Sequence, residues 1–179
     1  MRRIATEVIT AAAVAAGLPE DAVMIEPDGD GAALPSKRVG IAFLDEQYTR
    51  TGRPIRKRAT VGKESTHRTL TRERASVRLS ARAAVHTDDE AWLSEFSRRF
   101  VAALPKRTVD ENGNAVGVAV DRAEYGGFAA EADATGQALS KTFYLIFTGM
   151  ITTENEIPLI TSVTITPEYR EASNEQEQD

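Results

Sequence analysis

The stretch SVRLSARAAV, Ser76–Val85, decides the fold of this chain. Apolar and polar side chains alternate through it, with Val77, Leu79, Ala81, Ala83 and Val85 set against Arg78, Ser80 and Arg82. Successive side chains of a strand point to opposite faces of a sheet. The pattern therefore predicts a strand that has one face on a core and the other in solvent.

A second alternating stretch, Arg38–Leu44, precedes this strand and predicts a partner for it through Val39, Ile41 and Phe43. Between the two, Gly62–Ser65 can turn the chain, so the simplest arrangement is one long β-hairpin. Its outer part, Pro54–Arg74, has few large apolar side chains and cannot bury enough surface to fold back on a core. We therefore expect an arm, at about residues 50–76, that projects from the domain.

The charge of this region differs from that of the rest of the chain. Arg50–Arg82 holds 11 of the 22 basic residues but only two acidic ones, which gives the window a net charge of +9. The whole chain has a net charge of −5, so the remaining residues carry −14. Five basic residues on the outer limbs are our candidate partner-binding residues: Arg56, Lys57, Arg58, Arg72 and Arg74.

Two helices are predicted. Ile4–Ala15 has apolar residues at helical spacing, and Gly17 is placed to end that helix. In the second helix, Thr87 and Glu90 fit a capping box with Thr87 as the N-cap. Its apolar face contains Trp92, Leu93, Phe96, Phe100 and Leu104.

The remaining segments predict strands. A short one is expected at Ala22–Glu26, and Asn112-Gly113 predicts a hairpin with a two-residue type I′ turn before a strand at Val116–Val120. Thr142–Ile151 is apolar on both faces and predicts a central strand, while Leu159–Thr166 alternates again.

These elements predict an α+β fold in which a mixed, mainly antiparallel sheet packs against two helices and carries the projecting arm. Residues 1–167 are expected to form one domain, and residues 168–179 an acidic tail that is disordered in isolation.

Composition excludes several classes of protein. The chain lacks cysteine, so it has no disulfides or thiolate metal sites, and no apolar run approaches the ~20 residues that cross a membrane. Arg2-Arg3 and the alanine-rich run that follows imitate a signal peptide, but Glu7 interrupts the run. We expect a cytoplasmic protein without a membrane partner.

The search for catalytic or metal chemistry gives no match. His67 and His86 lie in different predicted elements and lack further ligands of the kind a zinc site needs. VGKEST, residues 61–66, lacks the first glycine and the hydroxyl residue of a phosphate loop, and PDGDG, residues 27–31, departs from a calcium loop. The carboxylates of Asp88–Glu90 are explained by helix capping. We therefore predict no enzyme, no catalytic residue, no metal and no cofactor.

The basic arm leaves three interpretations open. It could bind nucleic acid through phosphates, although no aromatic residue from Thr49 to Ala91 is available to stack on bases. It could be a solvated hairpin whose charge keeps an exposed edge from aggregating. It could also lie on the acidic surface of an identical copy and so build an assembly.

The order of elements resembles that of tail terminator and related tail-completion proteins of long-tailed bacteriophages. The resemblance rests on RLSARAAVHTDDEAWLSEFSRRFVAAL (78–104), the Asn112-Gly113 hairpin, and FYLIFTGMI (143–151) followed by IPLITSVTITPEY (157–169). It covers about Arg38–Tyr169 as a layout of elements.

The resemblance implies a structural virion protein without catalytic residues. Such a subunit would form a homohexameric ring that caps the tail tube, stops its polymerisation and joins the tail to the head connector. Its partners would be copies of itself, the tube or sheath protein and the connector, with DNA passing through the channel without sequence preference. It would assemble in the host cytoplasm and reside in the tail or neck. The chain's length and acidic tail depart from the pattern, so another neck or tube-associated subunit, or a DNA-binding architectural protein, stays open.

Overall fold

The computed structural model describes residues 1–25, 35–52, 54–59, 67–126 and 139–158. In this part of the chain it has two α-helices, a short 3₁₀ turn and seven strands in one sheet, which confirms the predicted α+β class. The helices are α1 (Arg2–Ala15) and α2 (Glu90–Ala103), and the 3₁₀ turn is Glu20–Ala22. The strands are β1 (Val23–Ile25), β2 (Arg38–Arg50), β3 (Pro54–Ala59), β4 (His67–Thr87), β5 (Arg107–Val109), β6 (Ala115–Gly126) and β7 (Leu139–Pro158).

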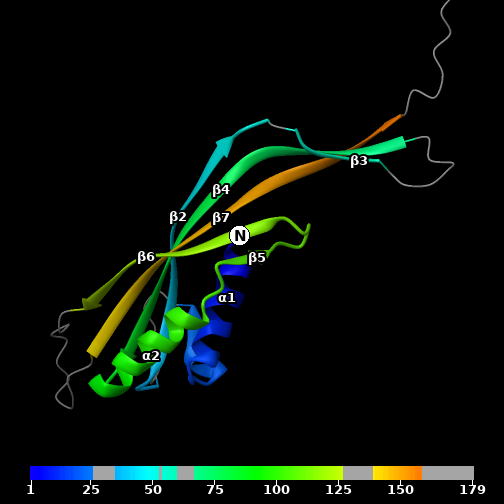
Figure 1. Cartoon of the computed structure of the whole chain (residues 1–179). Coiled ribbons are helices and arrows are strands. Elements are labelled where there is room, and N and C mark those ends of the chain that lie inside the picture. The colour runs from blue at the N-terminus through cyan, green and yellow to red at the C-terminus, as the bar shows by residue number, and fades with distance from the viewer. Residues whose placement is uncertain (26–34, 53, 60–66, 127–138, 159–179) are drawn as a thin grey trace, which may run out of the picture.

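The sheet is built around β4 and β7, its two longest strands. The strand order is β1-β2-β4-β7-β6-β5, and β3 pairs with β4 beyond the end of β2. Only the β1–β2 pair is parallel among these strands, and the sheet twists strongly along its length (Figure 1). Val39 pairs with Val85 and Phe43 with Ala81, so the predicted base of the long hairpin is confirmed.

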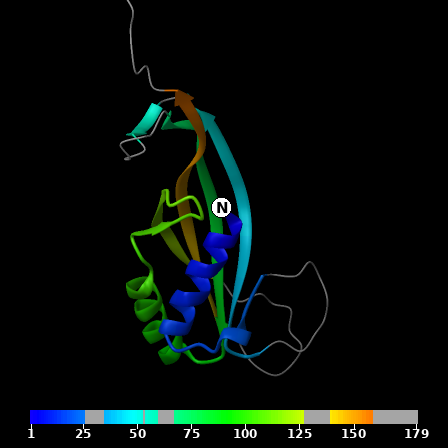
Figure 2. The ribbon, with the colours of Figure 1, turned by 90° about the vertical axis from the view of Figure 1, so that its right-hand side faces the viewer.

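The core lies on one face of the sheet, beneath both helices (Figure 2). Leu79, Ala81, Ala83 and Val85 are fully buried, as their alternation predicted, and the facing residues Phe143, Leu145 and Phe147 of β7 are buried with them. We call this the helix-covered face, and the side that carries Arg78, Ser80 and Arg82 the helix-free face.

Helix α1 packs closely on the sheet through small residues. Ala5, Ala12 and Ala13 are buried, which lets the helix backbone approach the strands. The helix ends as predicted at Gly17, whose φ is 103°. The Gly17 N–H donates to the Val14 carbonyl and the Leu18 N–H to the Ala13 carbonyl, which satisfies two carbonyls of the last turn.

Helix α2 supplies an aromatic row to the core. The ring centroids of Trp92 and Phe96 are 4.7 Å apart, those of Phe96 and Phe100 5.9 Å, and those of Phe100 and Phe143 5.2 Å. These contacts tie the helix to the middle of β7 and confirm its predicted apolar face.

The predicted cap of α2 was wrong. Asp89, not Thr87, is the N-cap: its carboxylate accepts from the Trp92 N–H at 2.9 Å. Thr87 is still the last residue of β4, paired with Leu139, and its hydroxyl accepts from the Asp89 N–H at 3.1 Å. Because Thr87 is paired with β7, the N-cap of the helix lies two residues later in the chain than predicted.

The β5–β6 hairpin was predicted, but its two-residue turn was not correct. The Asp110 N–H donates to the Asn114 carbonyl at 2.9 Å, which leaves three residues in the loop, and Gly113 has a φ of 73°. The Asp110 carboxylate also accepts the N–H groups of Asn112 and Asn114 at 2.9 and 2.7 Å. An aspartate that binds nearby backbone in this way favours the longer turn.

Strand β7 confirms the predicted central strand Thr142–Ile151 but continues to Pro158. The added residues pair with the first part of β4, up to the pair His67 and Pro158. Likewise, β6 continues past the predicted strand Val116–Val120 to Gly126. The predicted strand Leu159–Thr166 and the acidic tail lie outside the described residues.

Candidate functional site

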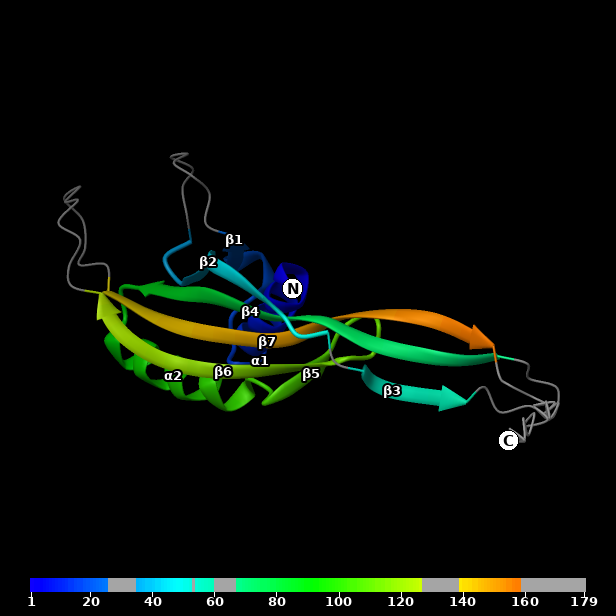
Figure 3. The same ribbon diagram turned by 90° about the horizontal axis from the view of Figure 1, so that it is seen from above.

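The candidate site is the outer part of the sheet, where three strands continue past the helices (Figure 3). We call it the distal extension and define it as Pro54–Ala59 of β3, His67–Arg74 of β4 and Thr152–Pro158 of β7. Strand β4 lies in the middle: Leu70 pairs with Lys57 on one side and with Asn155 on the other. The extension is therefore continuous with the core through two unbroken strands.

All five predicted partner-binding residues lie in this extension. Arg56, Lys57 and Arg58 of β3 pair with Thr71, Leu70 and Thr69 of β4. Arg72 and Arg74 follow on β4 and are exposed. The structure thus brings together residues that are up to 18 positions apart in the sequence.

The third strand was missing from the prediction and changes the charge of the site. Glu154 and Glu156 of β7 pair with Thr71 and Thr69. The Thr71 hydroxyl lies 3.4 Å from a Glu154 carboxylate oxygen, and Arg74 Nε donates to the Thr153 hydroxyl at 3.0 Å. The extension is therefore a basic pair of strands beside an acidic one, and not a two-stranded basic arm.

The expectation that the outer limbs bury little is wrong at Leu70, which is only 6% exposed. Leu70 is not part of the main core cluster, so it is buried locally within the extension. That this segment projects free of the domain stays a prediction, because the turn at residues 60–66 lies outside the described residues.

The other sequence candidates do not form a metal site in the described residues. No group of three or more His, Asp or Glu side chains there is arranged so that it could hold a metal ion. His67 begins β4, whereas His86 near the other end of the strand pairs with Arg38 and Ser140. The PDGDG and VGKEST segments both lie outside the described residues.

Of the acidic residues at the start of α2, Asp89 has a clear structural role. The hydrogen bond from the Trp92 N–H lowers the pKa of the Asp89 carboxyl, and Lys37, whose Nζ lies 3.4 Å away, lowers it further. Both effects stabilise the charged cap, which agrees with a capping role for this group rather than a catalytic one.

A charged cluster that the sequence did not suggest lies on the helix-free face. The Arg122 guanidinium stacks 3.9 Å from the centre of the Tyr144 ring and pairs with Asp121 at 3.0 Å and Glu124 at 2.7 Å. The hydrogen bond to Glu124 raises the pKa of Arg122, and the same bond lowers the pKa of Glu124. Asp121, Arg122 and Tyr144 also line a cavity of about 300 Å³, together with Asp45 and Arg78. The two acidic and two basic side chains of this lining largely compensate one another in charge.

A comparison with models of protein families and with curated proteins found no match. No helix in the described ranges has the length and apolar character needed to cross a membrane.

Proposed function

We propose that this chain is a structural subunit that assembles into a ring through its distal extension. The observation that carries the proposal is the continuation of β4 and β7 past the helices, with five basic residues gathered on the outer strands. A 21-residue strand is far longer than the 5–6 residues typical of a strand in a small domain. A long, charged and helix-free extension suits contact with another molecule better than it suits a core.

The charge distribution supports contact between identical copies. A positively charged window and an acidic remainder are complementary, so the extension of one copy can lie on the body of the next. Repeating such a head-to-tail contact with a fixed rotation closes a ring. By its resemblance to tail terminators, the ring would hold six copies, cap a phage tail tube and join it to the head connector, in the virion tail or neck.

The test of this function is assembly. Mass photometry and electron microscopy of the purified chain, alone and with tail tubes, should find rings with a central channel. A chain that stays monomeric under both conditions contradicts the proposal. Rings that do not block tube elongation would favour another neck subunit.

A DNA-binding architectural protein is the second candidate, because of the same +9 window. Neutralising phosphates releases counterions, so this function predicts duplex binding that weakens steeply with salt. Tight binding by the monomer at physiological salt would favour this function over ring assembly.

A further inference from the structure

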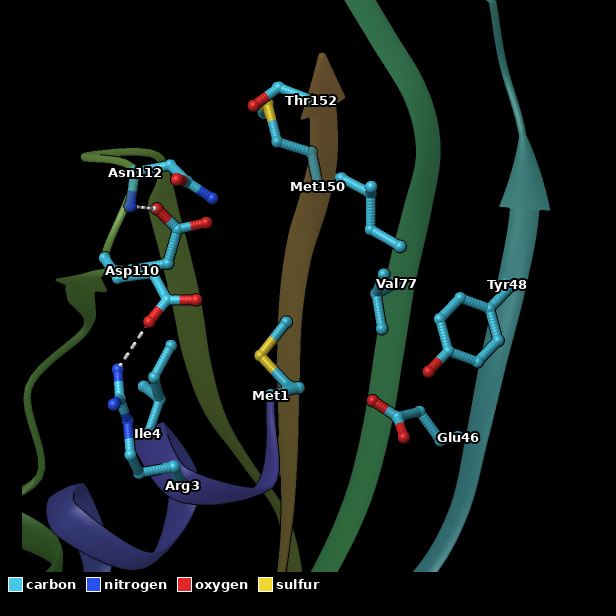
Figure 4. A pocket seen from close by; sticks show the side chains of 12 residues that line it. Met1, Arg3, Ile4, Glu46, Tyr48, Val77, Asp110, Asn112, Met150 and Thr152 are labelled. Atoms are coloured by element: carbon cyan, nitrogen blue, oxygen red, sulfur yellow. Dashed lines mark hydrogen bonds and ion pairs between the residues drawn. The ribbon is translucent and has the colours of Figure 1, made fainter.

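A groove lies where the helices end and the distal extension begins (Figure 4). It has a volume of about 390 Å³ and is bounded by the start of α1, the middle of β2, the β5–β6 turn and β7. The residues that line it include Met1, Ile4, Glu46, Tyr48, Glu111 and Ile151. It lies on the helix-covered face, just past the part that α1 covers.

The floor of the groove is apolar but incompletely covered. Tyr48 is 58% exposed and Ile151 44% exposed. Gly149 makes room for the Met1 side chain, since a Cβ at this glycine would lie 2.5 Å from Met1 Cε. Met1, Tyr48 and Ile151 therefore present a shallow, partly exposed apolar surface to solvent.

The rim of the groove is acidic. Glu46 lies beside Tyr48, whose pKa is raised by burial and by a hydrogen bond to the Glu46 carboxylate. Across the groove, Glu111 pairs with Arg3 at 2.9 Å, with both side chains about two-thirds exposed. Asp110 adds a third carboxylate, so the lining holds three acids and one arginine.

An apolar floor with an acidic rim is suited to a lysine or arginine side chain. The methylene stem of such a residue covers apolar surface while its charged head stays at the edge. Its head can then pair with a carboxylate and lie near the face of Tyr48. On this chain, β3 contains Arg56 and Arg58, which are two residues apart, the spacing that places side chains on one face of a strand, with Lys57 between them.

Tyr48, at one end of the groove, is out of reach of the β3 of the same copy. That strand pairs with Arg68–Arg72 of β4, whereas Tyr48 pairs with Val77. The seven residues from Leu70 to Val77 separate Lys57, which pairs with Leu70, from Tyr48 by ~23 Å along the sheet at ~3.3 Å per residue. A β3 that keeps its pairing can therefore contact Tyr48 only in another molecule.

We propose that the groove receives the basic strand β3 of a second copy of this chain. This inference rests on the proposed function, because it names the surface through which neighbouring subunits contact each other. It predicts a charge-dependent contact between Arg56 and Arg58 of one copy and Glu46 and Glu111 of the next.

Charge reversal tests the pairing. The double variant Glu46→Lys and Glu111→Lys, and separately Arg56→Glu with Lys57→Glu and Arg58→Glu, should each weaken ring formation at least tenfold. Combining both sets in one chain should restore it. The matched control, Glu20→Lys with Asp21→Lys, changes two exposed acids far from the groove and should assemble like the parent.

Cross-linking tests the contact without reversing charge. The chain has no cysteine, so Tyr48→Cys and Arg58→Cys each introduce a single thiol. Mixed and oxidised, these two proteins should form a disulfide-linked heterodimer, whereas Ile25→Cys mixed with Arg58→Cys should not.

The outcomes separate the inference from the proposed function. Rings that form normally despite groove reversal, or the absence of the heterodimer cross-link in parent-like rings, overturn the groove and leave ring assembly standing. A parent chain that never assembles overturns both.

Discussion

The two halves of β4 have the same backbone pairing but different surroundings. From Val77 to Val85 the strand lies under two helices and every second residue is fully or nearly fully buried. From His67 to Arg74 the strand has a neighbour on each side, yet Leu70 is its only residue classed as buried where burial is described. Hydrogen-bonded ladders thus extend the strand, but the apolar contacts that stabilise a fold are concentrated in the half from Val77 to Val85.

The largest effect should come from the core half. Phe96→Ala removes the middle ring of the aromatic row and should lower the free energy of unfolding by ~3–5 kcal/mol. Denaturant titration followed by circular dichroism measures it. A loss below 1 kcal/mol would mean that the helix is not the main support of this half.

A smaller but clear effect is expected in the extension. Leu70→Ala removes its one described buried large side chain. It should cost about 2 kcal/mol, the lower end of the range for a leucine, because the extension has no helix over it and can relax around the gap. The same titration measures it, with the exposed Val109→Ala as control. No change would show that the extension is held by its ladder alone.

The cap of α2 should contribute in a pH-dependent way. The pKa of Asp89 is lowered from 3.8 in the folded protein, so its charge stabilises the fold above the unfolded pKa and this stability is lost as pH falls through the folded pKa. Asp89→Asn keeps a good cap but does not titrate. The difference in melting temperature between the parent and this variant should therefore shift in favour of the variant below about pH 4. Asp88→Asn, at the exposed neighbouring acid, serves as the control, and an unchanged difference would contradict the assignment.

The smallest effect on folding should come from the five basic residues. Replacing Arg56, Lys57, Arg58, Arg72 and Arg74 with Ser should leave the melting temperature almost unchanged, because exposed charges contribute ~0–1 kcal/mol per pair. Assembly, measured by mass photometry, should be lost. The control replaces Arg2, Arg98, Arg99, Lys106 and Arg107 with Ser.

Two other results of this five-residue variant would change the interpretation of the basic strands. A melting temperature far below that of the parent would mean that the basic strands are packed structure. A normal melting temperature with normal assembly would mean that the charge only keeps an exposed sheet edge solvated.

The fold was predictable where apolar residues recur with the period of a strand or of a helix. Val77–Val85 and the apolar face of α2 determine which residues meet the core, and both predictions held. The cap was missed because Thr87 and Asp89 both suit that role, and only the ladder to Leu139 decides between them. The end of β7 was missed because TTENE is polar on both faces and its pairing is set by a strand far away in the sequence.

The site was predictable only in part. The clustering of the five basic residues followed from one local hairpin. The groove did not, because Glu46, Glu111 and Ile151 come from three elements that only the folded sheet brings together. No spacing in the sequence marks such a set.

The long pairing of β4 with β7 has a consequence for how the chain folds. His67 pairs with Pro158, 91 residues later, and α2 and the β5–β6 hairpin lie between the two strands. Contacts between residues so far apart form slowly, because a large loop must close before they are made. During synthesis, α1, β2 and α2 are therefore complete before β7, and they can pack with β4 before its β7 partner is available. The β4–β7 pairs of the distal extension are the most widely separated in sequence, so this part of the ladder should be the last to form. A subunit therefore becomes competent to bind another copy only after its own β7 is in place.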